Sequence, residues 1–168
     1  MRGWIEGPKI VGEFGVATVD SIREAYDILN LDMVQVGPFQ GANVLGLLEG
    51  IPLIKEMVIE PLVDDREVQA ACEDAGPYVQ FFILDFAANG FDWGSIKEGN
   101  GFRLEILKEI CRKHNVLLKM DITGTEVLEV LEIVNPYGLS VTGGSEEKVG
   151  FKSFDELDDI FEAIEIFV

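Results

Sequence analysis

The sequence predicts a parallel α/β fold, in which each buried strand is followed by a helix. Apolar runs of four to eight residues alternate six times with amphipathic segments. The runs are largely apolar on both faces, which is typical of parallel strands covered on both sides. The segments between them carry apolar residues at helical spacing. Such a sheet is either a (β/α) barrel, complete or partial, or a doubly wound sheet, and this pattern alone is compatible with both.

The elements follow one another in a regular order along the chain. Strands are expected at residues 9–14, 33–36, 53–59, 79–86, 116–120 and 139–141. Helices are expected at 21–30, 42–48, 66–73 and 102–113, with two more near 123–134 and from 153 onward. Residues 87–93 are expected to form a polar loop. Capping boxes mark three of the helix starts: Ser21 with Glu24, Thr123 with Glu126, and Ser153 with Glu156. Asp64 is placed to cap the helix at 66–73, which ends before Gly76-Pro77.

Length and charge restrict the class of protein. The 168 residues suit one domain spanning 1–168, and the 48% hydrophobic content is that of a globular chain. Thirteen basic and 31 acidic residues give a net charge of −18, which repels nucleic acids and anionic membranes. The sequence has no apolar run of the roughly 20 residues that a membrane helix needs, and residues 1–6 contain no hydrophobic signal core. We therefore expect a cytoplasmic protein without nucleic-acid or membrane partners.

Metal and cofactor chemistry lacks a supporting motif. Cys72 and Cys111 are far apart in sequence and are expected to be reduced core thiols. His114 follows Arg112-Lys113 at a helix C-terminus, where positive charge suits the helix dipole, and is expected to be a surface cap. We expect no metal site and no cofactor.

The last third of the chain carries the clearest ligand signal. A short strand ends in Thr142-Gly143-Gly144, and glycines at such a strand end let backbone N–H groups face an anion. Lys148 and Lys152 lie nearby in a chain poor in positive charge. The alternative is a plain tight turn. On the first interpretation, Thr142, Gly143 and Gly144 bind a small phosphorylated ligand.

Three charged residues at strand ends are candidates for proton transfer. Asp85 ends an apolar strand, and a carboxylate at the carboxyl end of a barrel strand points into the mouth where such enzymes work. Lys119 and Asp121 leave the fifth strand two residues apart, hence on one face. Asp85 and Asp121 would then make a pair of carboxylates beside the Lys119 ammonium. The structural alternatives are a loop cap for Asp85 and a rim salt bridge for the other two.

Two further residues are candidates for ligand binding. Gln35, at the end of the second strand, has an amide suited to orienting a ligand, or to bonding a neighbouring loop. Lys55 and Glu56 lie within the third strand, where charges are costly unless paired. One of the two is expected to face the interior.

Five segments, in the same order, resemble the phosphoribosylanthranilate isomerase family, whose members are (β/α)8 barrels. Residues 11–14 (VGEF) and 33–37 (MVQVG) are similar to the family's V-G-x-F and V-Q-L-H-G strands. Residues 82–85 (FILD) and 91–93 (FDW) resemble its L-L-D … F-D-W segment. Residues 135–144, with Gly150 and Lys152 beyond, resemble its P-x-x-V-D-V-S-S-G-V-E … G-x-K-D ending. The resemblance implies a TIM-barrel-like parallel (β/α) barrel shortened to about six βα units.

The resemblance also implies roles and differences. Asp85 matches the family's general acid, which protonates the ribose ring oxygen in an Amadori rearrangement. Lys55 coincides with a lysine of the family, so we expect Lys55, rather than Glu56, to face the interior. The catalytic cysteine of the family's K-I-C-G motif has no counterpart. Either the first two βα units are missing, or Lys9-Ile10-Val11-Gly12 aligns with that motif and Val11 replaces the cysteine. The family's S-G-G turn falls on Lys119-Met120-Asp121.

Two functions are therefore carried forward. The first is a phosphoribosylanthranilate isomerase-like enzyme of tryptophan biosynthesis, an intramolecular oxidoreductase of the aldose–ketose type, with Asp85 as acid and Asp121 as replacement base. The second is a non-catalytic phosphate-ligand-binding or assembly protein derived from the same barrel. Because six strands of an eight-stranded design leave two exposed edges, we expect either that two chains pair, as a homodimer or another homo-oligomer, or that the N-terminal residues close the gap.

Overall fold

Six parallel strands form one sheet in the computed structural model of the chain, which describes residues 7–142, 146–148, 151–152 and 155–167. The strands pair in chain order: β1 (Val11–Phe14), β2 (Met33–Val36), β3 (Leu53–Val58), β4 (Phe81–Asp85), β5 (Val116–Lys119) and β6 (Gly138–Leu139). This order is that of a barrel wall, because a doubly wound sheet reverses its strand order at a switch point. All six predicted strands are confirmed. Within the described residues β1 and β6 are the edges of the sheet.

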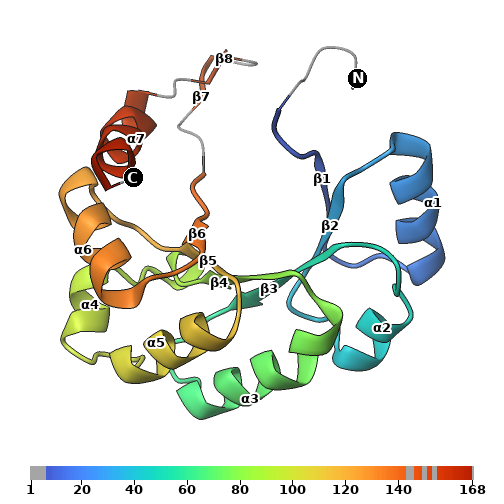
Figure 1. The fold of residues 1–168 in the computed structure, drawn as a ribbon, viewed down its shortest axis with the longest axis horizontal. Helices are drawn as coiled ribbons and strands as arrows, with labels where there is room; N and C mark the ends of the chain where they lie inside the picture. Colours follow the sequence, from blue (N-terminus) through green and yellow to red (C-terminus); the bar gives the residue numbers. More distant parts are fainter. Residues whose placement is uncertain (1–6, 143–145, 149–150, 153–154, 168) are drawn as a thin grey trace.

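Helices connect the strands and lie outside the curved sheet (Figure 1). They are α1 (Val19–Leu29), α2 (Ala42–Gly46), α3 (Asp65–Ala75), α4 (Trp93–Lys97), α5 (Leu104–Lys113), α6 (Gly124–Val134) and α7 (Asp155–Phe167), with 3-10 turns η2 (Gly76–Tyr78) and η3 (Ala87–Asn89). A short antiparallel hairpin, β7 (Glu146–Lys148) and β8 (Phe151–Lys152), comes between β6 and α7. No helix in the described part of the chain is both long and apolar enough to cross a membrane.

Both faces of the sheet carry buried apolar side chains, and these belong to two separate clusters. Parallel register places Leu53, Phe82 and Val116 on the outer face, where the main core forms between sheet and helices. The alternate residues Met33, Ile54 and Ile83 form a smaller cluster on the inner face. The two clusters explain why the strands are apolar at consecutive positions.

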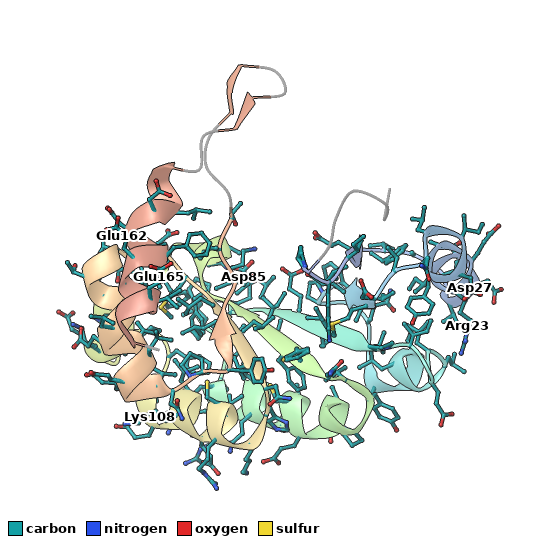
Figure 2. All side chains as sticks on the ribbon, turned by 45° about the horizontal axis from the view of Figure 1, so that its top comes forward. Arg23, Asp27, Asp85, Lys108, Glu162 and Glu165 are labelled. Atoms are coloured by element: carbon teal, nitrogen blue, oxygen red, sulfur yellow. The ribbon has the colours of Figure 1, made fainter. Side chains whose placement is uncertain are left out.

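The charged side chains lie mainly at the periphery. Arg23 and Asp27 on α1, Lys108 on α5 and Glu162 on α7 lie at the outside of the molecule, whereas Asp85 lies near its middle at the end of β4 (Figure 2). A carboxylate that is 3% exposed needs hydrogen-bond or ionic partners to be stable there.

Most of the expected helix starts are confirmed, and one is wrong. Asp64 caps α3 by accepting from the Arg66 N–H at 3.0 Å, and Thr123 with Glu126 forms the predicted capping box. In α1, however, the cap is Thr18, whose hydroxyl accepts from the Ser21 N–H. The helix therefore begins one turn earlier than the Ser21–Glu24 pattern indicates. The box at Ser153 and Glu156 lies outside the residues whose side chains are described.

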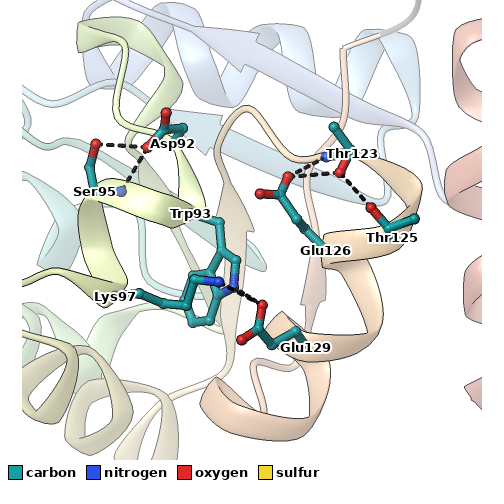
Figure 3. A network of polar contacts seen from close by, with 8 residues as sticks. All are labelled: Asp92, Trp93, Ser95, Lys97, Thr123, Thr125, Glu126 and Glu129. Atoms are coloured by element: carbon teal, nitrogen blue, oxygen red, sulfur yellow. Dashed lines mark hydrogen bonds and ion pairs between the residues drawn. The ribbon is translucent and has the colours of Figure 1, made fainter.

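The segment expected as a polar loop contains η3 and leads directly into α4, which the sequence pattern missed because α4 is only five residues long. Trp93, which is fully buried, attaches α4 to the neighbouring α6 (Figure 3). Its indole N–H donates to Glu129 at 2.7 Å, and Lys97 forms an ion pair with the same carboxylate at 2.9 Å. The apolar ring lies in the main core, so one side chain anchors the loop after β4.

His114 is the C-cap of α5, as predicted, but it is partly buried and not a surface residue. Its ring packs edge-on against Phe82, with 5.3 Å between the ring centroids. Burial lowers the pKa of the imidazole, so the neutral form is favoured in the folded chain. A structural role under the sheet follows from these contacts.

Candidate functional site

The strongest polar contact on the inner face joins the ends of two adjacent strands. Asp85 at the end of β4 and Lys119 at the end of β5 are register partners, so their side chains leave the same face of the sheet. The Lys119 Nζ donates to Asp85 Oδ2 at 2.5 Å. Both residues are therefore brought together at the carboxyl end of the sheet, which is where (β/α) barrels carry their active sites.

Asp85 has a second partner that holds its orientation. The backbone N–H of Ala88 donates to Asp85 Oδ1 at 2.9 Å, in the first turn of the loop after β4. The carboxylate thus caps the following loop and pairs with Lys119 at the same time. Asp85 can cap the loop through Oδ1 and interact with Lys119 through Oδ2, so its geometry is compatible with both a structural and a functional role.

Lys119 is an ammonium surrounded by carboxylates. In addition to its bond with Asp85, the Lys119 Nζ lies 3.9 Å from Glu56 Oε1, and the Glu13 carboxylate attracts it electrostatically. The hydrogen bond to Asp85, followed by the nearby negative charges, raises the pKa of Lys119. Lys119 is therefore a cation at neutral pH, and this part of the inner face carries a net negative charge.

A cavity of about 560 Å³ opens beside this pair. Lys119, Asp121, Ser140 and Thr142 line it, together with parts of the loop after β4 and of α7. Its volume is within the 300–1,000 Å³ that is usual for ligand sites. Asp85 is not among the lining residues, so Lys119 is the member of the pair that reaches the cavity. Asp121 is exposed and shares the cavity with Lys119, as their spacing predicts.

The remaining predicted ligand residues are placed differently. Gln35 is in register with Glu13 and Ile54 on the inner face, but it does not line the cavity. Thr142 does line it. Gly143 and Gly144, the centre of the expected anion site, lie outside the described residues, as do the side chains of Lys148 and Lys152.

The expectation that Lys55 faces the interior is wrong. Its register partner is Phe82, which lies in the core beneath the helices, so Lys55 leaves the outer face. Its Nζ donates to the Gly37 carbonyl oxygen at 2.6 Å. Glu56, the next residue, is the one that faces inward. Alternation along the strand shows that Lys55 and Glu56 lie on opposite faces, but it does not show which face is the inner one.

Sequence reasoning missed Glu56 and Glu13 as members of the site. Both belong to short strands, and each lies two positions from an inner-face apolar residue, Ile54 and Val11 respectively. Strand residues alternate between the two faces of a sheet. Both glutamates would therefore have been predicted on the same face as Lys119 if the inner face had been known from the sequence.

Both cysteines are buried and favour the protonated thiol form. Cys72 and Cys111 are buried in the core on the helix side of the sheet. Burial is the main cause that raises the pKa of each thiol to about 12. Among the described residues there is also no cluster of three or more histidine, cysteine, aspartate or glutamate side chains able to hold a metal ion.

Comparison with known proteins gives a consistent result. Residues 4–163 match the family model described as N-(5'phosphoribosyl)anthranilate (PRA) isomerase. The N-(5'-phosphoribosyl)anthranilate isomerase of Caldanaerobacter subterraneus subsp. tengcongensis is 25% identical over 159 residues, covering 95% of this chain and 73% of that protein. Two solved structures of such isomerases share the fold.

The phosphoribosyl anthranilate isomerase of Thermus thermophilus aligns with a TM-score of 0.69 at 22% identity, over 99% of this chain and 78% of that one. An isomerase in complex with reduced 1-(o-carboxyphenylamino)-1-deoxyribulose 5-phosphate aligns with a TM-score of 0.64 at 19% identity, over 95% and 74% of the two chains. These structural likenesses agree with the barrel-like order of the strands.

Proposed function

Because the chain belongs to the N-(5'-phosphoribosyl)anthranilate isomerase family, we propose that it isomerises a phosphorylated aminosugar of the phosphoribosylanthranilate type, as in tryptophan biosynthesis. The observation that carries this proposal is the Asp85–Lys119 pair at the strand ends, beside a cavity of about 560 Å³. The phosphorylated ligand in one structural relative supports the same substrate class.

The proton donor in this proposal is the Asp85–Lys119 pair rather than either residue alone. In an Amadori rearrangement, protonation of the ribose ring oxygen breaks the bond between that oxygen and C1′ and leaves an open-chain iminium. The Lys119 ammonium reaches the cavity and is hydrogen-bonded to Asp85. The Lys119 ammonium donates another of its protons to the ring oxygen and becomes a neutral amine, and Asp85 positions Lys119 for this transfer through their hydrogen bond.

Asp121 is the proposed base. After ring opening, its carboxylate removes the proton from C2′; the electrons of that C–H bond form the C1′=C2′ bond of an enaminol, while the π electrons of the C1′=N bond return to nitrogen and neutralise the iminium. Return of a proton to C1′ and loss of the hydroxyl proton give the ketose, so atoms and charges balance. Asp121 is exposed along the same cavity as Lys119, which suits a group that must exchange protons with solvent. Thr142 and the Gly143-Gly144 turn are the proposed phosphate contacts, and Gln35 is proposed to orient the ligand.

The test of this function is turnover by the purified chain. We expect conversion of phosphoribosylanthranilate, followed by loss of its fluorescence, and rescue of a tryptophan auxotroph that lacks the isomerase. If neither occurs while phosphate still raises the melting temperature, the chain is a binding protein and the proposed reaction is wrong.

We further propose that two chains associate. The sheet of the described residues has two edges, β1 and β6, whose backbone groups are open to pairing with another chain. Size-exclusion chromatography with light scattering is expected to give twice the mass of one 18.6 kDa chain. A monomer at every concentration tested would contradict association.

A further inference from the structure

The outer face of the sheet carries a buried charge that the proposed reaction does not use. Lys55 is 6% exposed, and Gly37 provides one acceptor for its three N–H donors. Within the described residues no carboxylate lies within 4.0 Å of its Nζ. Burial is the main cause that lowers the pKa of this ammonium to about 8. A buried cation with unused donors is costly unless something else binds to it.

A separate cavity of about 310 Å³ lies against this ammonium. It opens between β3, α2 and α3, because α2 has only five residues and covers less of the sheet than the 11-residue α1 and α3. Its walls are mainly apolar, with Ala42, Met57, Ala71 and Ala75 among them. It shares none of its lining residues with the cavity beside Asp85 and Lys119.

We propose that this outer cavity binds a small organic carboxylate, whose carboxyl group accepts hydrogen bonds from Lys55 and whose short apolar body packs against Met57 and the alanines. Among the residues that line this cavity, Lys55 is the one cation and the exposed Asp74 is the one carboxylate, so the cavity favours a monoanion with an apolar body over a more highly charged ligand. A dianion such as phosphate matches it poorly, because its second charge has no partner there. The proposal goes beyond the isomerase reaction and uses the opposite face of the sheet.

Isothermal titration calorimetry with butyrate and benzoate at pH 7 tests the proposal directly. We expect both carboxylates to bind and to raise the melting temperature, whereas butan-1-ol and inorganic phosphate at the same concentrations have little effect. Lys55→Met, which keeps the length of the side chain, is expected to weaken carboxylate binding at least about tenfold. The matched control Lys108→Met changes an exposed lysine on α5 and should bind like the parent chain. Equal binding of butan-1-ol, or unchanged binding by Lys55→Met, would overturn the proposal.

If Lys55 binds the carboxylate, the affinity must follow the protonation of its ammonium group. The charged groups near Lys55 are Glu56 on its own strand and Asp74 from α3, while α2 and the loop at 38–41 contribute none. Carboxyl groups ordinarily titrate near pH 4, so a change between pH 7 and 10 acts on the ammonium. Affinity should be constant below about pH 8 and then fall about tenfold per pH unit. A flat profile up to pH 10 would place the carboxylate elsewhere.

A second variant separates the cavity from the charge. Ala71 is exposed on α3 and lines the cavity, so Ala71→Phe should fill it while Lys55 stays in place. We expect Ala71→Phe to lose carboxylate binding with an unchanged urea midpoint, and normal binding by this variant would contradict the proposed location. None of these measurements uses isomerase turnover, so the failure of one proposal can be distinguished from failure of the other.

Discussion

Asp85→Asn is expected to lower kcat/KM for phosphoribosylanthranilate by about a thousandfold, within the range for loss of a general acid. The substitution keeps an amide oxygen that can accept from the Ala88 N–H, so the loop after β4 retains its cap. It removes the carboxylate that pairs with Lys119 at 2.5 Å. Steady-state kinetics measure the loss, and urea unfolding shows whether the fold is retained.

Two variants make this result specific. Asp27→Asn changes an exposed aspartate on α1, far from Asp85 in Figure 2, and should keep parental kinetics. Lys119→Met should also reduce kcat/KM, and combining it with Asp85→Asn should cost little more, because the two residues act as one donor. Fully additive losses would show that the two residues do not act as one donor, and an Asp85→Asn variant within a few fold of the parent would show that Asp85 is structural.

Trp93→Ala is expected to reduce the free energy of unfolding by about 3–5 kcal/mol, as for other large buried aromatic residues. Trp93 is 0% exposed, and its ring contributes to the main core while its indole N–H bonds Glu129. The alanine variant loses this burial and leaves a cavity between α4 and α6. Urea unfolding followed by circular dichroism measures the change.

The comparison variants for Trp93 separate packing from hydrogen bonding. Trp93→Phe keeps most of the ring burial and loses the indole donor, so we expect a smaller loss of about 1 kcal/mol. Phe39→Ala removes a ring that is 84% exposed and should change stability by less than about 0.5 kcal/mol. A loss below about 1 kcal/mol for Trp93→Ala would show that α4 contributes little to the fold.

The local sequence signals were sufficient where one element decides the outcome. Runs of residues that are apolar on both faces predicted the strands, and the predicted bounds of β2 agree with the observed ones. The Thr123–Glu126 box and the Asp64 cap depend on residues two or three positions apart, so sequence alone identifies them. The cap of α1 was assigned to Ser21 because Thr18 and Ser21 are both good caps, and the choice between them is made where the chain leaves β1.

Other features needed the folded chain. The spacing of Lys119 and Asp121 predicted that they lie on one face, and both line one cavity. The position of Asp85 at a strand end predicted that it points inward, and its register with Lys119 places it on the inner face. The 2.5 Å contact between Asp85 and Lys119 depends on the β4–β5 register, which is set by backbone pairing between segments 34 positions apart. Which of Lys55 and Glu56 faces the helices depends on which side of the sheet the helices cover. Period-two alternation is the same for either choice. Only the tertiary structure therefore placed Glu56 near Lys119 on the inner face, and Lys55 on the outer face beneath α2 and α3.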